Sequence, residues 1–93
     1  MEIAAFQQLM ADTYGVRDRA RGLSPTLVWL TEELGELARA VRKGTVEEQL
    51  HELGDVLAWT ASLANQLGLS LETAAARYAG GCPKCDAAPC VCG

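Results

Sequence analysis

The chain has 93 residues, which suits one small domain near the lower limit of what can bury its own core, and such a chain often shares its core with a second copy. Its formal charge of -4 and its lack of any long basic run argue against binding to duplex nucleic acid. No apolar run is long enough to span a bilayer and the N-terminus lacks the pattern of a signal peptide, so we expect a soluble, cytoplasmic protein without membrane partners.

The first half of the chain predicts two helices. Apolar residues at helical spacing predict the first over residues 2–14, with Gly15 as its end and a polar connection at 15–23. Ser24 followed by proline is typical of an N-cap and a first helical position, so the second helix should start there and run to about Lys43.

Two further helices are predicted in the second half. Thr45 can cap a third helix over residues 46–67, which Gly68 should end, and Ser70 can cap a short fourth helix over 71–79. No segment alternates as a strand does. The fold class is therefore predicted to be all-α, with about four helices per chain.

The second and third predicted helices each carry an apolar stripe. Its members are Leu27, Leu30, Leu34, Leu37 and Val41 on the second helix and Val46, Leu50, Leu53, Leu57 and Ala64 on the third. The short connection between these helices forces them to be antiparallel neighbours, and we expect the stripes to form their seam. The third helix is apolar on its other sides too. We therefore expect it at the centre of a helical hairpin bundle that a homodimer completes.

Acidic residues occupy the same two helices. In a tight antiparallel hairpin centred on Gly44, residues at equal height have numbers that add to a constant, and each set lies on one helical stripe. The pairs are Glu36 with Glu52, Glu33 with Asp55, and Trp29 with Trp59. Four carboxylates should thus converge in one patch, with two indoles at its open end.

A solvated helix face is the usual explanation for such acids, and it predicts basic residues three or four positions later. Only Glu36 has one, Arg39, and we expect Arg39, Arg42 and Lys43 largely on a different side of the helix. Clustered carboxylates repel, and a divalent cation relieves the repulsion. Oxygen ligands favour Mg²⁺ or Mn²⁺, and the neighbouring indoles suggest a nucleotide, whose base they stack while the metal holds its phosphates.

At these residues the chain resembles a known family. Glu32-Glu33-x-x-Glu36, fifteen intervening residues and Glu52-x-x-Asp55 are similar to the EExxE…ExxD motif of the MazG-like all-α nucleoside triphosphate pyrophosphohydrolases, over about residues 17–78. The resemblance implies that Glu33, Glu36, Glu52 and Asp55 hold Mg²⁺. It implies that Glu32 orients or deprotonates the attacking water, or binds a further metal ion. It also implies a dimer or a dimer of dimers that cleaves a nucleoside triphosphate to the monophosphate and pyrophosphate.

Substrate contacts are less determined. Members of that family carry a phosphate-binding lysine and asparagine in or after the last helix, and this chain has no matching lysine. Arg77 or the arginines from Arg17 onward could replace it. Asn65 could help or could form a hydrogen bond within the bundle, and Trp29 and Trp59 could contact the base or belong to the core. The only histidine, His51, is expected to be a hydrogen-bonded bystander.

The end of the chain holds all four cysteines, in the pattern C-x2-C-x4-C-x-C. Two short-spaced thiolate pairs indicate a structural Zn²⁺ site similar to a zinc knuckle, with Cys82, Cys85, Cys90 and Cys92 as its ligands. Disulfides and free thiols are the alternatives. We therefore divide the chain into a pyrophosphohydrolase domain at 1–79 and a zinc-binding tail at 80–93.

Three functions remain open at this point. The first is Mg²⁺-dependent hydrolysis of canonical or damaged nucleoside triphosphates, which would clean the nucleotide pool. The second is phosphoribosyl-ATP pyrophosphohydrolase activity, which uses the same kind of helical carboxylate site. The third is a non-catalytic, nucleotide-binding regulatory dimer, which the small number of phosphate-binding cations favours.

Overall fold

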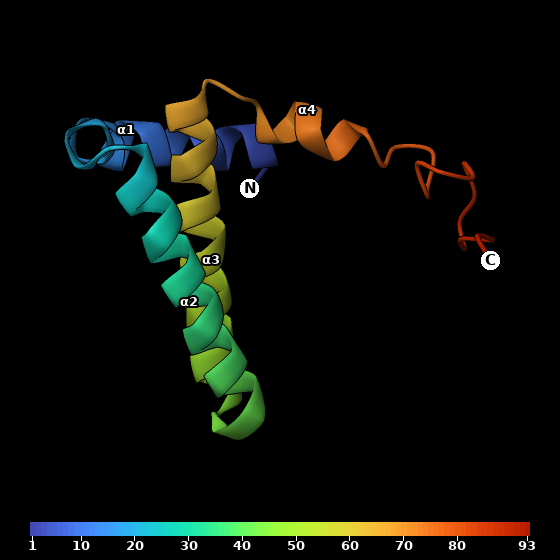
Figure 1. Ribbon diagram of the computed structural model, residues 1–93, viewed down its shortest axis with the longest axis horizontal. Coiled ribbons are helices and arrows are strands. Elements are labelled where there is room, and N and C mark those ends of the chain that lie inside the picture. Colours follow the sequence, from blue (N-terminus) through green and yellow to red (C-terminus); the bar gives the residue numbers. More distant parts are fainter.

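The computed structural model describes all 93 residues and contains four helices and no strand, so the all-α prediction is confirmed. The helices are α1 (Ile3–Arg21), α2 (Leu23–Lys43), α3 (Val46–Leu67) and α4 (Leu71–Ala76). Figure 1 shows α2 and α3 side by side as an antiparallel hairpin, with α1 across its open end and α4 leading away from it. No helix is both long enough and apolar enough to cross a membrane.

The first helix is longer than predicted. The expected end at Gly15 and the polar connection at 15–23 are wrong, because α1 continues through a buried Gly15 to Arg21. A glycine inside a helix costs only about 1 kcal/mol relative to alanine, and the arginine-rich turns that follow form helix well. Gly22 ends α1 instead, with a φ of 95° that favours glycine, and its N–H donates to the carbonyl of Asp18 at 2.9 Å.

The second helix begins at Leu23, two residues before Pro25, so the predicted N-cap at Ser24 is wrong. Gly22 precedes the helix, and no side chain caps it. Pro25 still lies in the first turn, where a missing N–H leaves no hydrogen bond unmade.

The later caps are confirmed. The Thr45 hydroxyl accepts the Glu48 N–H at 3.2 Å, and Ser70 accepts the N–H of Thr73 at 3.1 Å. Gly68 ends α3 with a φ of 68° in the left-handed region. The short fourth helix stops at Ala76, sooner than predicted.

The predicted leucine seam is wrong. Most of both stripes is exposed, as for Val46 at 75 % and Leu50 at 71 %, while Thr26, Glu33 and Ala40 are the buried residues of α2. These three are seven positions apart and share one face. Consecutive helical residues are about 100° apart, so Leu27, Leu34 and Val41, which directly follow them, are turned away from α3. The exposed members of the apolar stripes therefore form an outer face of the hairpin, while Ala64 belongs to the core.

Polar contacts hold α1 across the hairpin. The Gln7 amide donates to the Asn65 side chain at 3.0 Å, and Asn65 donates back to the Gln7 carbonyl at 3.1 Å. At the other end of the crossing, Gln66 of α3 donates to the fully buried Thr26 hydroxyl at 2.7 Å, and Arg21 of α1 reaches the same hydroxyl at 3.4 Å. The central position predicted for the third helix is confirmed, because α3 packs against both α1 and α2.

Candidate functional site

The predicted carboxylate patch lies between α2 and α3. Oxygen atoms of Glu33 and Glu36 from α2 and Glu52 from α3 lie within 4.8 Å of one another. His51, Glu52 and Asp55 form a second group of the same size, so Glu52 belongs to both. The antiparallel hairpin brings together all four acids named as metal ligands.

No basic side chain neutralises the centre of this patch. The ion pairs of the chain join Arg21 to Asp18 at 2.8 Å and His51 to Asp55 at 3.3 Å, and the glutamates take part in neither. Glu33 is only 9 % exposed. One oxygen of Glu33 and one of Glu52 are buried without a hydrogen-bond partner. Such orphaned anionic oxygens are costly unless a cation compensates them.

The pKa values of the patch move in the direction that this crowding predicts. Burial raises the pKa of Glu33, and the neighbouring charges of Glu36, Asp55 and Glu52 raise it further. The pKa of Glu52 is raised by the loss of hydration and then by Glu36, while His51 opposes the shift. Each shift reports repulsion between like charges in a partly dehydrated site.

The donor set fits a hard divalent cation. It consists of carboxylate oxygens from two facing helices. One oxygen of Glu33 and one of Glu52 have no hydrogen-bond partner in the chain. Mg²⁺ and Mn²⁺ prefer such ligands, whereas zinc sites normally include nitrogen or sulfur. His51 is paired with Asp55 and exposed, as expected of a hydrogen-bond partner at the rim of the patch.

The two tryptophans meet as the hairpin geometry predicts. The Trp29 and Trp59 rings are stacked, with centroids 6.0 Å apart and planes inclined by 14°. The Arg21 guanidinium lies 4.7 Å from the centroid of the Trp59 ring. Trp59 is thus engaged by two neighbours, while Trp29 keeps 45 % of its surface exposed.

A pocket beside these rings joins α1 to the carboxylates. Tyr14, Arg17, Asp18 and Arg21 line it from α1, and Asp55 and Trp59 line it from α3. Both Arg17 and Arg21 belong to the group of arginines from Arg17 onward that the sequence offers as phosphate ligands. The helical continuation of α1 is the reason that both arginines lie one turn apart on the same wall.

A second group of cations lies at the turn end of the patch. Arg39 and Lys43 line a pocket together with Glu36 and Glu52. The expectation that they lie largely on another side of the helix is wrong for these two residues. Neither forms an ion pair with the glutamates, so their charges stay available to a ligand.

Comparison with protein families agrees with the geometry. The model of the MazG nucleotide pyrophosphohydrolase domain matches residues 21–80. The chain belongs to the MazG family. The matched segment contains α2, α3 and α4, hence all five motif acids and both indoles. Membership indicates nucleotide pyrophosphohydrolase chemistry and dependence on a divalent metal in general terms. No curated protein matches the chain.

Three predicted residues of the MazG domain lie apart from the patch. Glu32 is exposed and belongs to neither group of acids. Both ends of the Asn65 amide are occupied by Gln7, so it joins α1 to α3. The Arg77 guanidinium lies over the ring of Tyr78, at 5.5 Å from its centroid, beyond the end of α4.

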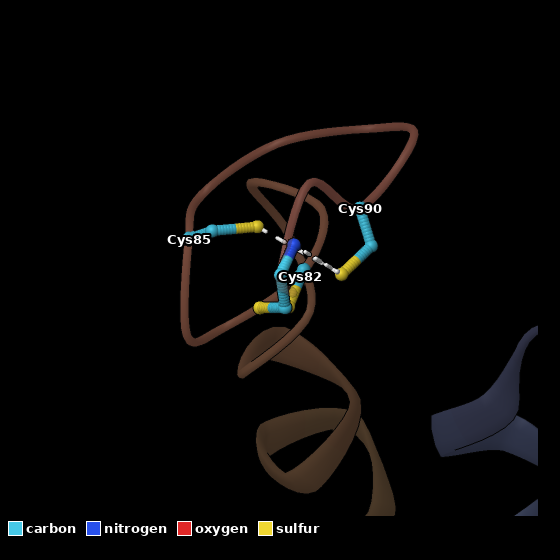
Figure 2. A group of neighbouring side chains, drawn as sticks. Cys82, Cys85 and Cys90 are labelled. Atoms are coloured by element: carbon cyan, nitrogen blue, oxygen red, sulfur yellow. Dashed lines mark hydrogen bonds between the residues drawn. The ribbon is translucent and has the colours of Figure 1, made fainter.

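The cysteines gather outside the MazG match. All four are free thiols whose sulfur atoms lie within 4.8 Å of one another, so they could hold a metal ion. Figure 2 shows the Cys85 and Cys90 side chains pointing toward each other across the loop of the tail, with Cys82 between them. A hydrogen bond from the Val91 N–H lowers the pKa of Cys85 to about 6.

Proposed function

We propose that this MazG protein is a Mg²⁺-dependent nucleoside triphosphate pyrophosphohydrolase, which releases a nucleoside monophosphate and pyrophosphate. The observation that carries the proposal is the convergence of Glu33, Glu36 and Glu52 within 4.8 Å, with two buried oxygens that no group of the chain satisfies. The family match over the same residues supports it.

The four acids Glu33, Glu36, Glu52 and Asp55 would hold the metal. Bound Mg²⁺ supplies charge neutralisation of the polyphosphate and a more acidic water. In the reaction, a water oxygen bonds to the α-phosphorus, the bond to the bridging oxygen breaks, and pyrophosphate leaves with its electron pair. Glu32 lies outside both groups of acids, and the role proposed for it rests on the family motif: its exposed carboxylate would accept the proton that the water loses.

Two groups of cations flank the acids and suit an extended polyphosphate. Arg17 and Arg21 lie at the Asp55 end, and Arg39 and Lys43 lie at the turn end. Guanidinium groups bind phosphate oxygens in pairs, which orients the chain of phosphates along the patch. These residues take the part that the resemblance gave to a missing lysine.

The base is assigned to Trp29. The Trp29 residue is 45 % exposed, whereas the Trp59 ring already contacts both Trp29 and Arg21. A nucleobase can therefore stack on the exposed surface of Trp29 without breaking either contact. Trp59 then acts as a support that fixes the inclination of its neighbour.

The active unit is proposed to be a homodimer. Only three apolar residues are buried in the single chain, and all of them are alanines: Ala40, Ala61 and Ala64. The apolar stripes on the outer face of the hairpin remain exposed, with Leu34 at 50 % and Leu53 at 54 %. A second copy that packs its own hairpin on this face would supply the missing core.

Pyrophosphate release tests the proposal. Purified protein with Mg²⁺ should cleave members of a panel of ribo- and deoxyribonucleoside triphosphates. We expect Glu36→Gln or Asp55→Asn to reduce kcat/KM by roughly 100-fold or more, because each removes a charge that no neighbour replaces. Glu47→Gln is the matched control, since Glu47 lies on α3, the helix of Asp55, but outside both groups of acids.

The other outcomes identify the alternatives. Turnover of phosphoribosyl-ATP alone would assign the protein to the histidine-pathway activity. Nucleotide binding without turnover of any substrate would make it a regulatory dimer. Equal activity in Glu36→Gln and the wild type would show that the carboxylate patch has no part in catalysis.

A further inference from the structure

The cysteine tail at residues 82–92 is a compact loop that the helices do not hold in place. Beyond Gly81, no hydrogen bond or ion pair joins it to the helices. Its only cation is Lys84, and it contributes nothing to the buried core. A segment with so little apolar burial needs another source of order, such as a metal or disulfides.

The spacing of the sulfur atoms distinguishes these two sources. The Cys82 and Cys92 sulfurs are 3.7 Å apart, and those of Cys85 and Cys90 are 3.9 Å apart. Four sulfurs at 2.3 Å from a central zinc ion in tetrahedral geometry are separated by about 3.8 Å. A disulfide would require about 2.05 Å. The two pairs therefore have the edge length of a ZnS₄ tetrahedron.

The backbone of the tail is arranged around these sulfurs. The N–H of Val91 points to the Cys85 sulfur at 3.5 Å, and the N–H of Cys92 points to the Cys90 sulfur at 3.3 Å. The loop at residues 82–87 is closed by a backbone hydrogen bond, in which the Cys82 N–H donates to the Ala87 carbonyl at 2.9 Å. Peptide donors aimed at sulfur stabilise thiolates and orient them, as the outer shell of a metal site does.

We infer that the tail of each chain binds one Zn²⁺ through Cys82, Cys85, Cys90 and Cys92, and that this ion folds the tail. All four ligands come from one chain, so the site needs no second subunit. Four protein ligands leave no coordination position open, so the role of the ion is structural. The tail extends away from the hairpin in Figure 1, which separates this thiolate site from the carboxylate patch.

Cobalt titration tests the inference directly. Reduced protein stripped of metal should develop the thiolate-to-cobalt absorption and d–d bands of a tetrahedral four-sulfur site. This absorption should saturate at one Co²⁺ per chain, and Zn²⁺ should displace the cobalt. Cys90→Ser should weaken this binding by about tenfold or more, because a neutral hydroxyl replaces a thiolate ligand. Asp55→Asn should leave the cobalt spectrum unchanged.

Several results would overturn the inference. Half a cobalt ion per chain would place the site across two chains. Iron in the isolated protein, with the absorption of an iron–sulfur centre, would show that the four cysteines hold iron and not zinc. Protein that is isolated with two disulfides, 4 Da lighter than its reduced form, and that takes up no metal after reduction would show that the cysteines form disulfides instead of a metal site. Circular dichroism of Cys90→Ser should keep the helical signal, which separates loss of the site from loss of the fold.

Discussion

Glu33 shows how the fold prepares the patch for a cation. Its side chain is buried in the hairpin interior, in the stripe that also contains Thr26 and Ala40. Burial and three neighbouring carboxylates all act against its charge. This arrangement costs free energy in the metal-free chain, and the proposed cation would offset that cost.

The raised pKa values of Glu33 and Glu52 predict how the metal-free protein responds to pH. A carboxyl whose pKa is higher in the folded state binds more protons when folded, so its contribution to the free energy of unfolding is largest below the ordinary value of 4.5 and falls as pH rises through the folded value. In magnesium-free buffer, the wild type should therefore lose stability relative to Glu33→Gln between about pH 4.5 and neutrality.

Urea unfolding at a series of pH values measures this difference. Glu47→Gln serves as the control, because that carboxyl lies outside the patch. Added Mg²⁺ should reverse the trend, since it binds the ionised carboxylates. Parallel stability profiles for the wild type and Glu33→Gln would contradict the assigned crowding.

For single residues, the sequence predicts which side chains of α2 and α3 face each other, but not the positions of all the basic side chains near the patch. The pairs depend only on the position of the turn and on helical periodicity, and the stacked rings of Trp29 and Trp59 confirm them. Arg39 and Lys43 line a pocket with Glu36 and Glu52, and the positions of such long, flexible side chains depend on rotamers that the sequence does not determine. The arginines from Arg17 onward are predicted as phosphate ligands, but composition assigns them to a polar connection, whereas Arg17 and Arg21 belong to α1.

Among the elements, the α2–α3 turn determines the register of the whole site. Gly44 closes it, and a Cβ at that position would lie 2.8 Å from the carbonyl oxygen of Ala40 and 2.9 Å from its Cα. These are backbone atoms that cannot rotate away. The Gln49 amide also donates to this carbonyl at 3.1 Å, which fixes the first turn of α3 against α2.

Gly44→Ala should therefore destabilise the hairpin, by about 1–3 kcal/mol, which is typical of overpacking. Chemical unfolding monitored by circular dichroism gives the value. Gly80→Ala is the matched control, since nothing lies within 4 Å of a Cβ there, and its effect should stay within about 0.5 kcal/mol. An unchanged stability in Gly44→Ala would show that the turn is looser than the structure indicates.

The elements differ in how far the sequence determines them. The caps at Thr45, Gly68 and Ser70 act locally, so local patterns predict them. Helix propensity permits α1 to continue beyond Gly15, but the contact of Arg21 with Trp59 of α3 involves a residue far along the chain, which no local pattern reveals. The leucine stripes were assigned to the wrong contact because apolar periodicity marks a buried face without showing which partner covers it.

The whole molecule is too extended for a self-sufficient domain. Its radius of gyration is 15.4 Å, compared with about 12 Å for a compact chain of this length. Only eight residues are buried. Both observations agree with the proposed homodimer, in which the exposed leucines of α2 and α3 become core.

Leu53→Glu should disrupt that dimer. A charge in the centre of the apolar face should raise the dissociation constant by about 100-fold or more, equivalent to about 2.7 kcal/mol. Sedimentation over a range of concentrations measures it. Leu69→Glu is the control, because Leu69 is similarly exposed but lies beyond the hairpin. A monomeric wild type, or a dimer indifferent to Leu53→Glu, would contradict the proposed interface.

Binding of a hard cation between α2 and α3 is the central claim. Electron paramagnetic resonance of a Mn²⁺ solution to which zinc-loaded protein is added measures this binding without requiring turnover. The account predicts that the free Mn²⁺ signal falls as the wild type is added, that Mg²⁺ competes for the same site, and that Glu36→Gln loses most of the binding while Glu47→Gln keeps it. Retention of Mn²⁺ by Glu36→Gln, or no uptake by the wild type, would contradict the claim.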